Sequence, residues 1–297
     1  MCSHGIWMVK RFGKYLLHEC VAQGGITEIW LATDQFDNVM AVRLLKPASR
    51  GSSAPKLFKA GLKVHQKLSP HPNVIRYIDH GKAGGVPFMV LEYIQGSDLK
   101  MLFSRHHDHI ENVADVLIQM TDGLNHLHDQ GWMHLDYKPE NVMVSLNGHV
   151  SLLDFDTVQK LPRKPKKFPK ITGTPAYMPP EHLRGKAIDH RADIYAWGIT
   201  AYELLTHRKP FVGRNPEEAL RNQLKEKHHV KPVHQFNPDV PVALSALIQK
   251  CFAFHPEERF PSLTILNAQL HKILGVRNVP LVPTSLGELM EQPSFAS

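Results

Sequence analysis

The feature that most constrains the fold is a change in sequence pattern near residue 96. Before it, short runs of β-type residues alternate with glycine, aspartate and asparagine turns. These runs are KYLLHECVAQ (14–23), ITEIWLATD (26–34), NVMAVRLLK (38–46), NVIRYIDHG (73–81) and VPFMVLEYI (86–94). One segment among them, LFKAGLKVHQKL (57–68), has an apolar face at helical spacing instead. The first part of the chain therefore predicts a small β-rich lobe.

Beyond residue 96 the pattern is helical. Apolar residues recur at helical spacing in the segments 113–130, 193–207, 217–227, 242–254 and 262–274. The segment DIYAWGITAYELLTH (193–207) is apolar on nearly every side, which is typical of a helix inside a core. Because strands and helices occupy different parts of the chain, we predict an α+β fold with a β-rich N-terminal lobe and a larger helical C-terminal lobe.

The chain has 297 residues, of which 42% are hydrophobic, enough for a sizeable core. No apolar run approaches the ~20 residues of a membrane span, and the N-terminus lacks the apolar centre of a signal peptide. We therefore expect a soluble, cytoplasmic protein, of an oligomeric state that the sequence leaves open. The three cysteines have no C-x-x-C spacing, so we interpret them as buried or free thiols. The segment 275–297 is expected to be an extension that docks on the domain or stays mobile.

The formal net charge is +7, and the basic residues are densest in RKPKKFPK (163–170). Its prolines disfavour a helix or a strand there. Such a segment could recruit an acidic protein or nucleic acid, or contact only solvent, and charge alone makes nucleic-acid binding the less favoured interpretation. Four lysines of the segment 56–67 recur at three- and four-residue steps, and we interpret this stripe as a solvated helix face.

Two short segments carry the chemistry, HLDYKPEN (134–141) and LLDFD (152–156). Phosphoryl transfer needs metal ions, a group that orients the nucleophile, and donors around the phosphates. Asp136 could accept the proton of a substrate hydroxyl, and Lys138 could steady the transferred phosphoryl group. Asn141 and Asp154 offer the amide and carboxylate oxygens that suit Mg²⁺. Together these side chains predict a phosphotransferase.

These motifs resemble those of the eukaryotic-type protein kinase family, with its H-R-D-x-K-x-x-N loop and D-F-G segment. The resemblance covers roughly residues 14–274, with an N-lobe of about 14–95 and a C-lobe of about 96–274. It implies that Asp193 braces the catalytic loop and that Arg259 pairs with Glu181, at the end of GTPAYMPPE (173–181). The stretch VAQGGITEIW, and Lys138 together with Thr174, are most similar to bacterial Ser/Thr kinases.

The resemblance also implies an ATP site. The adenine would bond to the backbone of Glu92 and Ile94 after the gatekeeper Leu91, and Asp98 would reach the ribose. The ring would lie between Ile29, Ala41 and Met143. The family's glycine-rich loop corresponds to Ala22-Gln23-Gly24-Gly25-Ile26-Thr27, in which Ala22 and Gly24 would lie nearest the phosphates, and it is impaired rather than lost.

Three departures from the family concern the phosphate side. Arg43 stands where the family has the lysine of its V-A-I-K strand, and a planar guanidinium does not fit where an ammonium sits. Gly61 stands where the helix glutamate that pairs with that lysine is expected, and no Asp or Glu occurs between Asn38 and Ile78. Asp156 replaces the D-F-G glycine and adds either a further metal contact or an outward surface charge.

We weigh three functions. The complete set Asp136, Lys138, Asn141 and Asp154 favours a Ser/Thr protein kinase that uses ATP and Mg²⁺ on a protein substrate, which is acidic or docks on residues 163–170. The alternative is a pseudokinase that acts as a nucleotide-binding scaffold or allosteric regulator, because Arg43, Gly61 and Asp156 depart from the family. The third is a binder of nucleic acid or an acidic partner through the basic segment, which we consider unfavoured.

Overall fold

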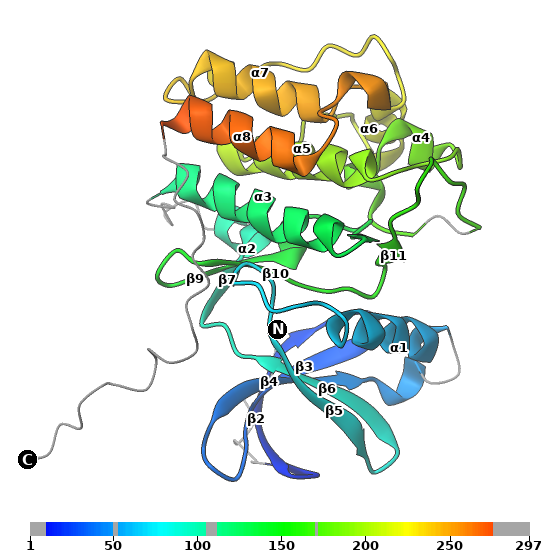
Figure 1. Cartoon of the computed structure of the whole chain (residues 1–297), viewed down its shortest axis with the longest axis vertical. Coiled ribbons are helices and arrows are strands. Elements are labelled where there is room, and N and C mark those ends of the chain that lie inside the picture. The colour runs from blue at the N-terminus through cyan, green and yellow to red at the C-terminus, as the bar shows by residue number, and fades with distance from the viewer. Residues whose placement is uncertain (1–9, 50–52, 105–111, 170–171, 276–297) are drawn as a thin grey trace, which may run out of the picture.

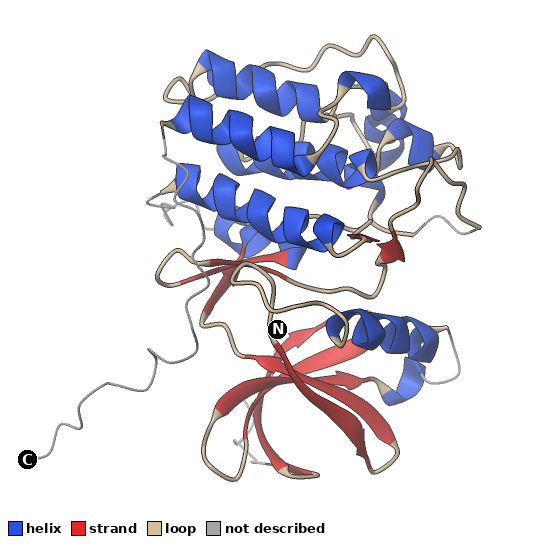
Figure 2. Cartoon of the chain, in the orientation of Figure 1, coloured by secondary structure: helices blue, strands red, loops and turns tan. Residues whose placement is uncertain are grey.

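The computed structural model describes residues 10–49, 53–104, 112–169 and 172–275. These residues form two lobes, one built on a sheet and one built on helices (Figures 1 and 2). Strands occupy the first part of the chain and most helices follow, so the α+β prediction is confirmed. The expected C-terminal extension lies outside the described residues from position 276 on.

The N-terminal lobe is an antiparallel sheet with the strand order β1-β2-β3-β4-β6-β5. Its strands are β1 (Lys10–Phe12), β2 (Tyr15–Gln23), β3 (Thr27–Thr33), β4 (Val39–Leu45), β5 (Tyr77–Ala83) and β6 (Val86–Glu92). Every residue of β4 after Val39 is buried, because this strand lies in the middle of the sheet and is covered on both faces. Strand β4 therefore holds its side chains in fixed positions beside the junction of the lobes.

Helix α1 (Ala54–His65) is the helix of the N-terminal lobe and lies beside the sheet (Figure 1). The predicted bounds 57–68 were wrong at both ends. The helix starts earlier because Pro55 fits the first turn, where no backbone N–H is needed. It ends at His65, and the next residues form a turn. All four lysines of the predicted stripe, Lys56, Lys59, Lys63 and Lys67, are exposed, as expected of a solvated face.

The C-terminal lobe is a helical bundle. Its helices are α2 (Leu99–Ser104), α3 (Val113–Asp129), α4 (Pro180–Leu183), α5 (Arg191–Thr206), α6 (Pro216–Gln223), α7 (Val242–Cys251) and α8 (Leu263–Leu274). Every residue of α5 after Arg191 is buried, which confirms the prediction of a core helix. Helices α3 and α8 are capped at their N-termini by Asn112 and Ser262, whose side chains accept hydrogen bonds from backbone N–H groups of the first turn.

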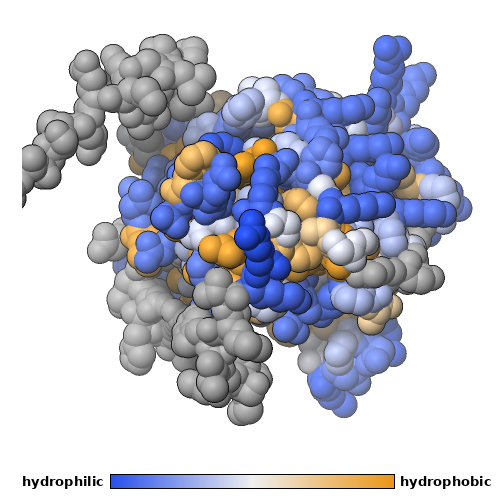
Figure 3. Space-filling model, turned by 90° about the horizontal axis from the view of Figure 1, so that it is seen from below, coloured by the Kyte–Doolittle hydropathy of each residue, from blue (hydrophilic) through white to orange (hydrophobic). Residues whose placement is uncertain are grey.

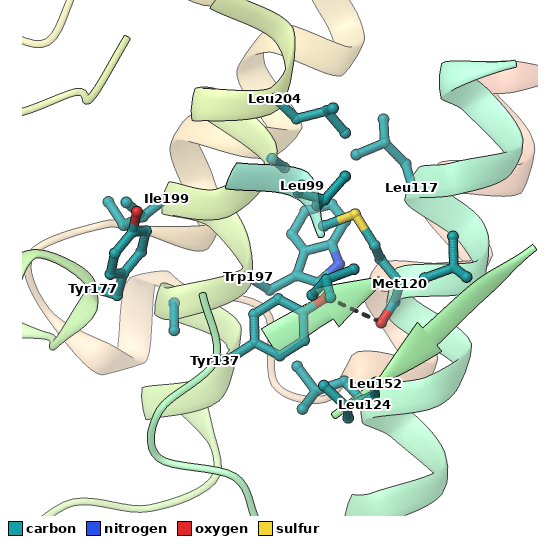
Figure 4. Packing of buried hydrophobic residues seen from close by; sticks show 14 of the residues in the cluster. Leu99, Leu117, Met120, Leu124, Tyr137, Leu152, Tyr177, Trp197, Ile199 and Leu204 are labelled. Carbon is teal, nitrogen blue, oxygen red and sulfur yellow. Dashed lines mark hydrogen bonds between the residues drawn. The ribbon is translucent and has the colours of Figure 1, made fainter. Parts of the chain in front are cut away.

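Two small sheets lie at the junction of the lobes. Strands β7 (Gly96–Asp98), β9 (Val142–Ser145) and β10 (Val150–Leu152) form one, and β8 (Trp132–Met133) pairs with β11 (Gln159–Lys160) in the other. The segment 134–141 connects β8 to β9 and packs against the core of the helical lobe. Figure 4 shows Tyr137 of this segment packed beside Trp197, with its hydroxyl 3.5 Å from the carbonyl oxygen of Met120.

The surface is mixed in character. Figure 3 views the end of the molecule at the N-terminal lobe and shows apolar side chains between hydrophilic ones. Leu16, Phe36 and Val39 are among the exposed apolar side chains of this lobe. Within the described part of the chain, no helix has both the length and the apolar character that crossing a membrane requires.

Candidate active site

The loop that follows β8 is anchored by side chains that are buried in the core. His134, Leu135 and Tyr137 point into the core and are at most 7% exposed. Asp193 of α5 accepts hydrogen bonds from the backbone N–H groups of His134 and Leu135, each at 2.8 Å. The predicted bracing role of Asp193 is thus confirmed. Because their neighbours are fixed in this way, Asp136 and Lys138 are presented to the junction of the lobes.

Asp193 also keeps its charge in the core. Burial alone would raise the pKa of its carboxyl group, but the hydrogen bond with His128 (2.8 Å) and the N–H of Leu135 hold the pKa below its usual value. A buried carboxylate that accepts several hydrogen bonds is a rigid anchor. Leu135, with its N–H on this anchor, has a left-handed φ of 62°, a conformation that costs about 1–3 kcal/mol and persists only when the surroundings enforce it.

Asp136, Lys138 and Thr174 form a closed polar triangle. The ammonium of Lys138 lies 2.8 Å from Oδ2 of Asp136 and donates to Oγ1 of Thr174 at 2.8 Å. The hydroxyl of Thr174 donates to Oδ1 of Asp136, also at 2.8 Å. Both oxygens of the carboxylate thus have partners, and its orientation is fixed. Lys138 is 36 residues from Thr174 along the chain, and only the fold brings them into contact.

Asn141 and Asp154, the predicted metal ligands, flank the same loop. Nδ2 of Asn141 donates to the backbone carbonyl of Asp136 at 2.8 Å, which leaves its amide oxygen as the atom for a metal. Asp154 has a side chain that is 41% exposed. No group of three or more His, Cys, Asp or Glu side chains within the described residues could by itself hold a metal. One amide and one carboxylate fit Mg²⁺, since this ion keeps water and phosphate oxygens as its other ligands.

Arg43 lies next to Asp154, on strand β4. Its Nη2 is 3.3 Å from Oδ1 of Asp154. Partial desolvation by the surrounding protein favours the neutral form of this carboxyl group, but the positive charge of Arg43 and the N–H of Asp156 hold its pKa below the usual value. Asp154 is therefore ionised at neutral pH, as a metal ligand must be. Its φ of 55° is left-handed, which aspartate tolerates better than most residues.

Asp156 is the main partner of Arg43. Nη1 and Nη2 of Arg43 donate to Oδ1 and Oδ2 of Asp156 at 3.0 and 2.7 Å, the bidentate geometry typical of a strong pair. Nε of Arg43 donates to Oγ1 of Thr27 at 3.3 Å. Asp156 is only 8% exposed, so the interpretation as an outward surface charge was wrong. Burial and the nearby Asp154 raise the pKa of Asp156, while Arg43 opposes this shift.

Helix α1 contributes a histidine and a glycine to the site, and no carboxylate. His65 is buried, and its ring lies 4.6 Å from the ring of Phe155, which in turn lies 5.8 Å from that of His134. Burial and the charge of Arg43 lower the pKa of His65 to about 3, so this ring is neutral. Helix α1 has no acidic residue, and the main partner of Arg43 lies on the loop after β10 instead.

The residues predicted to bind adenine are distributed over both lobes. Ile29 and Ala41 lie on β3 and β4, and Met143 lies on β9. Glu92 is the last residue of β6, and Ile94 lies in the connection that follows it. Asp98 is the register partner of Met143, and its Oδ1 accepts a hydrogen bond from the N–H of Met101 at the start of α2. One oxygen of the predicted ribose ligand is therefore engaged. Ala22, near the end of β2, and Gly24, in the turn between β2 and β3, are both exposed.

Arg259 and Glu181 form a buried bidentate pair. Nη1 and Nη2 of Arg259 donate to Oε1 and Oε2 of Glu181 at 2.7 and 2.9 Å. The arginine side chain is fully buried and the glutamate side chain is 11% exposed. This confirms the pairing that the sequence implies. The pair connects α4, at the end of the segment 173–181, to the core of the helical lobe.

The basic segment 163–170 is largely irregular, as predicted. Within residues 161–169 the exception is an antiparallel bridge between Lys166 and Ile188, formed by two backbone hydrogen bonds of 2.9 Å. The basic side chains Arg163, Lys164, Lys166 and Lys167 are exposed. Lys170 lies outside the described residues. A role of this segment in docking a partner stays a prediction.

Comparison with known proteins agrees with this geometry. The model of the protein kinase domain matches residues 15–271. This chain belongs to the protein kinase family. The two-lobed fold described above is therefore the fold of this family.

Several bacterial kinases are similar to this chain. Tyrosine-protein kinase MasK of Myxococcus xanthus is 32% identical over 274 residues, which cover 86% of this chain and 42% of MasK. Probable serine/threonine-protein kinase SCO3848 of Streptomyces coelicolor is 28% identical over 88% of this chain and 40% of its own length. Serine/threonine-protein kinase PknB of Mycobacterium leprae is 28% identical over 88% and 43%. The chain thus spans about two fifths of the length of these curated relatives.

Sequence reasoning missed three contributors to the site. In the sequence, Thr27 is only the last residue of the segment that corresponds to the glycine-rich loop, yet it accepts a hydrogen bond from Arg43. His65 falls within the predicted helical segment 57–68 but had no predicted role in the site. The pairing of Asp156 with Arg43 joins residues 113 apart along the chain. The sequence did contain a signal for the pairing of Asp156 with Arg43. The family's helix glutamate is missing at Gly61 and a new carboxylate appears at Asp156, which suggests that the negative charge has moved from one element to the other.

Proposed function

We propose that this chain is a Ser/Thr protein kinase that transfers the γ-phosphate of ATP to a protein hydroxyl with the help of Mg²⁺. The observation that carries the proposal is the triangle of Asp136, Lys138 and Thr174. Asp136 is positioned to accept the hydroxyl proton as the oxygen attacks the phosphorus, and Lys138, 2.8 Å from its carboxylate, supplies positive charge where the transferred group passes. Each carboxylate oxygen of Asp136 has one partner, Thr174 or Lys138, so each keeps a further lone pair that can accept the proton of a substrate hydroxyl.

The metal would be held by the amide oxygen of Asn141 and the carboxylate of Asp154. When bound, Mg²⁺ neutralises the charge that develops on the phosphate oxygens. The chain itself fixes these two ligands: Asn141 through its bond to the carbonyl of Asp136, and Asp154 through the N–H of Asp156. Ala22, Gly24 and Arg43 are proposed on the phosphate side, and Ile29, Ala41, Glu92, Ile94, Asp98 and Met143 around the nucleoside.

The proposal is tested with purified protein, γ-labelled ATP and a generic protein substrate. We expect label to appear on serine or threonine in acid hydrolysates of the substrate, and to disappear when EDTA removes Mg²⁺. Label on tyrosine would refute the assignment to the Ser/Thr class. Tyrosine is the specific alternative because this chain is similar to tyrosine-protein kinase MasK. Absence of any Mg²⁺-dependent label over the full range of ATP concentrations would refute catalysis.

One observation favours a pseudokinase as the second candidate. Nη2 of Arg43 lies 3.3 Å from Oδ1 of Asp154, so a protein cation already neutralises part of the carboxylate that should hold the metal. Such a protein would bind ATP with little dependence on Mg²⁺. The two candidates therefore differ in how much Mg²⁺ adds to the effect of ATP on thermal stability.

Substitution of Asp154 by asparagine separates these candidates. At saturating ATP, with a ligand concentration of 100 times Kd, we expect Mg²⁺–ATP to stabilise the wild type by about 2.7 kcal/mol. This corresponds to a rise in Tm of roughly 5–10 °C for a domain of this size. In Asp154→Asn the additional rise caused by Mg²⁺ should vanish. Asp129→Asn, which alters an exposed carboxylate on α3, is the control and should keep the full rise. An unchanged response in Asp154→Asn would contradict its role as metal ligand.

A further inference from the structure

The three departures from the family pattern meet at one point of the structure. Arg43 lies on β4, Asp156 on the loop after β10, and Gly61 in the middle of α1. The guanidinium of Arg43 bonds Asp156 with both of its Nη atoms, and its side chain is 7% exposed. The side chain of Asp156 is 10% exposed. This ion pair is therefore buried and has no solvent to replace a lost partner.

Gly61 lies directly against this pair. A Cβ atom added to Gly61 would lie 2.5 Å from Oδ1 of Asp156 and 3.3 Å from its backbone N. Real Cβ atoms do not approach other atoms as closely as 2.5 Å, so a side chain at this position excludes Asp156 from its present place. The reason for the glycine is thus steric, since its φ is not in the left-handed region. The carboxylate of Asp156 occupies the space that a side chain at position 61 would otherwise fill.

The exchange of lysine for arginine fits the same arrangement. A lysine offers one point-like ammonium, whereas the guanidinium presents two parallel N–H groups that match a carboxylate. Here the two Nη atoms face Asp156. Nη2 also lies 3.3 Å from Oδ1 of Asp154, and Nε donates to Oγ1 of Thr27. A single cation thus binds two acids on one loop and a hydroxyl on β3. Three changes that look like separate losses in the sequence form one complementary set.

We propose that Asp156 replaces the helix glutamate as the acid that positions the strand cation, so that the ion pair of this kinase joins β4 to the loop after β10 and Gly61 is the residue that makes room for it. Asp156 is a positioning residue in this proposal. The orientation of Arg43 toward the nucleotide phosphates rests on the function proposed above, whereas the ion pair itself does not.

The relocation changes what the pair responds to. In the family, the ion pair depends on the position of the helix that carries the glutamate. In this chain, α1 has no acidic residue, and the orientation of Arg43 depends on the loop that also carries Asp154. A movement of α1 away from the pair would remove none of the hydrogen-bonding partners of Arg43. A shift of residues 154–156 would disrupt the ion pair and the metal ligand together.

A double-mutant cycle tests the relocation. Gly61→Glu returns a carboxylate to α1, and Asp156→Gly removes the one on the loop. Each single variant is expected to lower Tm by roughly 5–10 °C, because the first forces two carboxylates together and the second deprives a buried arginine of its main partner. Each should also weaken ATP binding in calorimetry by about tenfold. The double variant should recover most of both losses, because one acid again faces Arg43.

Two further variants keep the test interpretable. Ala60→Glu adds the same charge at the neighbouring, exposed position of α1 and should change neither Tm nor ATP affinity. If Gly61→Glu does not fold, Gly61→Ala replaces it, since its Cβ alone meets Asp156. This variant should be destabilised in the wild-type background and tolerated together with Asp156→Gly.

The outcomes are distinct. Losses that simply add in the double variant would overturn the relocation, and so would a gain in ATP affinity on Asp156→Gly. A recovery of Tm without any change in ATP affinity would leave a structural ion pair and overturn the positioning role. Because both readouts are independent of turnover, a chain that fails to transfer phosphate could still show the full cycle, so failure of the proposed function would be recognised separately.

Discussion

Asp136→Asn is expected to lower kcat for phosphotransfer by about 10²–10⁴-fold, the usual contribution of a positioned general base. The asparagine has nearly the same shape but lacks the negative charge and the second acceptor. In the structure, Oδ1 of Asp136 accepts a hydrogen bond from Thr174, and Oδ2 forms an ion pair with Lys138. The amide nitrogen of the variant would face one of these donors, so the side chain would also lose its fixed orientation.

The measurement is the initial rate of labelled phosphate transfer at saturating ATP, together with the affinity for ATP. We expect the loss in kcat with an ATP affinity close to that of the wild type, because the role proposed for Asp136 concerns the acceptor hydroxyl rather than the nucleotide. The matched control is Glu140→Gln, which neutralises an exposed carboxylate in the same loop. Equal rates in wild type and Asp136→Asn would show that Asp136 is not the base.

Arg259→Ala is expected to produce the largest loss of stability. The guanidinium is fully buried and donates to both oxygens of Glu181 and to the carbonyls of Ala253, Arg191 and Phe254. Removing it leaves a buried carboxylate without its cation, which costs about 3–5 kcal/mol. For a domain of this size that corresponds to a fall in Tm of roughly 10 °C or more.

Thermal unfolding followed by circular dichroism measures this effect. The control is Arg214→Ala, because Arg214 is 92% exposed and its pair with Glu218 spans 3.9 Å on the surface. Exposed pairs of this kind contribute about 0.3–0.5 kcal/mol, so Tm should hardly change. The double variant Glu181→Ala/Arg259→Ala should lose less than the two single losses combined, since no buried charge then remains unpaired. Comparable losses at Arg259 and Arg214 would contradict the buried pair as an anchor.

Much of the fold could be predicted because it depends on local patterns. The β-type runs before residue 96 and the apolar segment 193–207 became strands and a fully buried helix. The bounds of α1 could not be predicted from apolar spacing alone. Helix α1 begins with Ala54 and Pro55, ahead of its first large apolar residue Leu57, and it ends where the chain turns after His65. Capping and turn geometry decide such ends, and apolar periodicity does not report them.

The sequence alone also predicted the candidate site, because Asp136, Lys138, Asn141 and Asp154 occur within 19 consecutive positions of the printed sequence at the family's spacing. Asp136, Lys138 and Asn141 share one short segment, whereas Asp154 follows β10, and its grouping with them came from the resemblance to the family. The pairing of Glu181 with Arg259 was likewise reached through the resemblance to the family and is present in the structure.

Only the tertiary structure decided the meaning of Arg43, Gly61 and Asp156. Taken one by one along the sequence, they indicate the loss of a lysine, of a glutamate and of a glycine. In three dimensions, the arginine and the aspartate form a bidentate pair across 113 positions, and the glycine leaves the space that the aspartate fills. The physical reason is that an ion pair depends on distance and burial, and sequence order does not specify either quantity for residues on different elements.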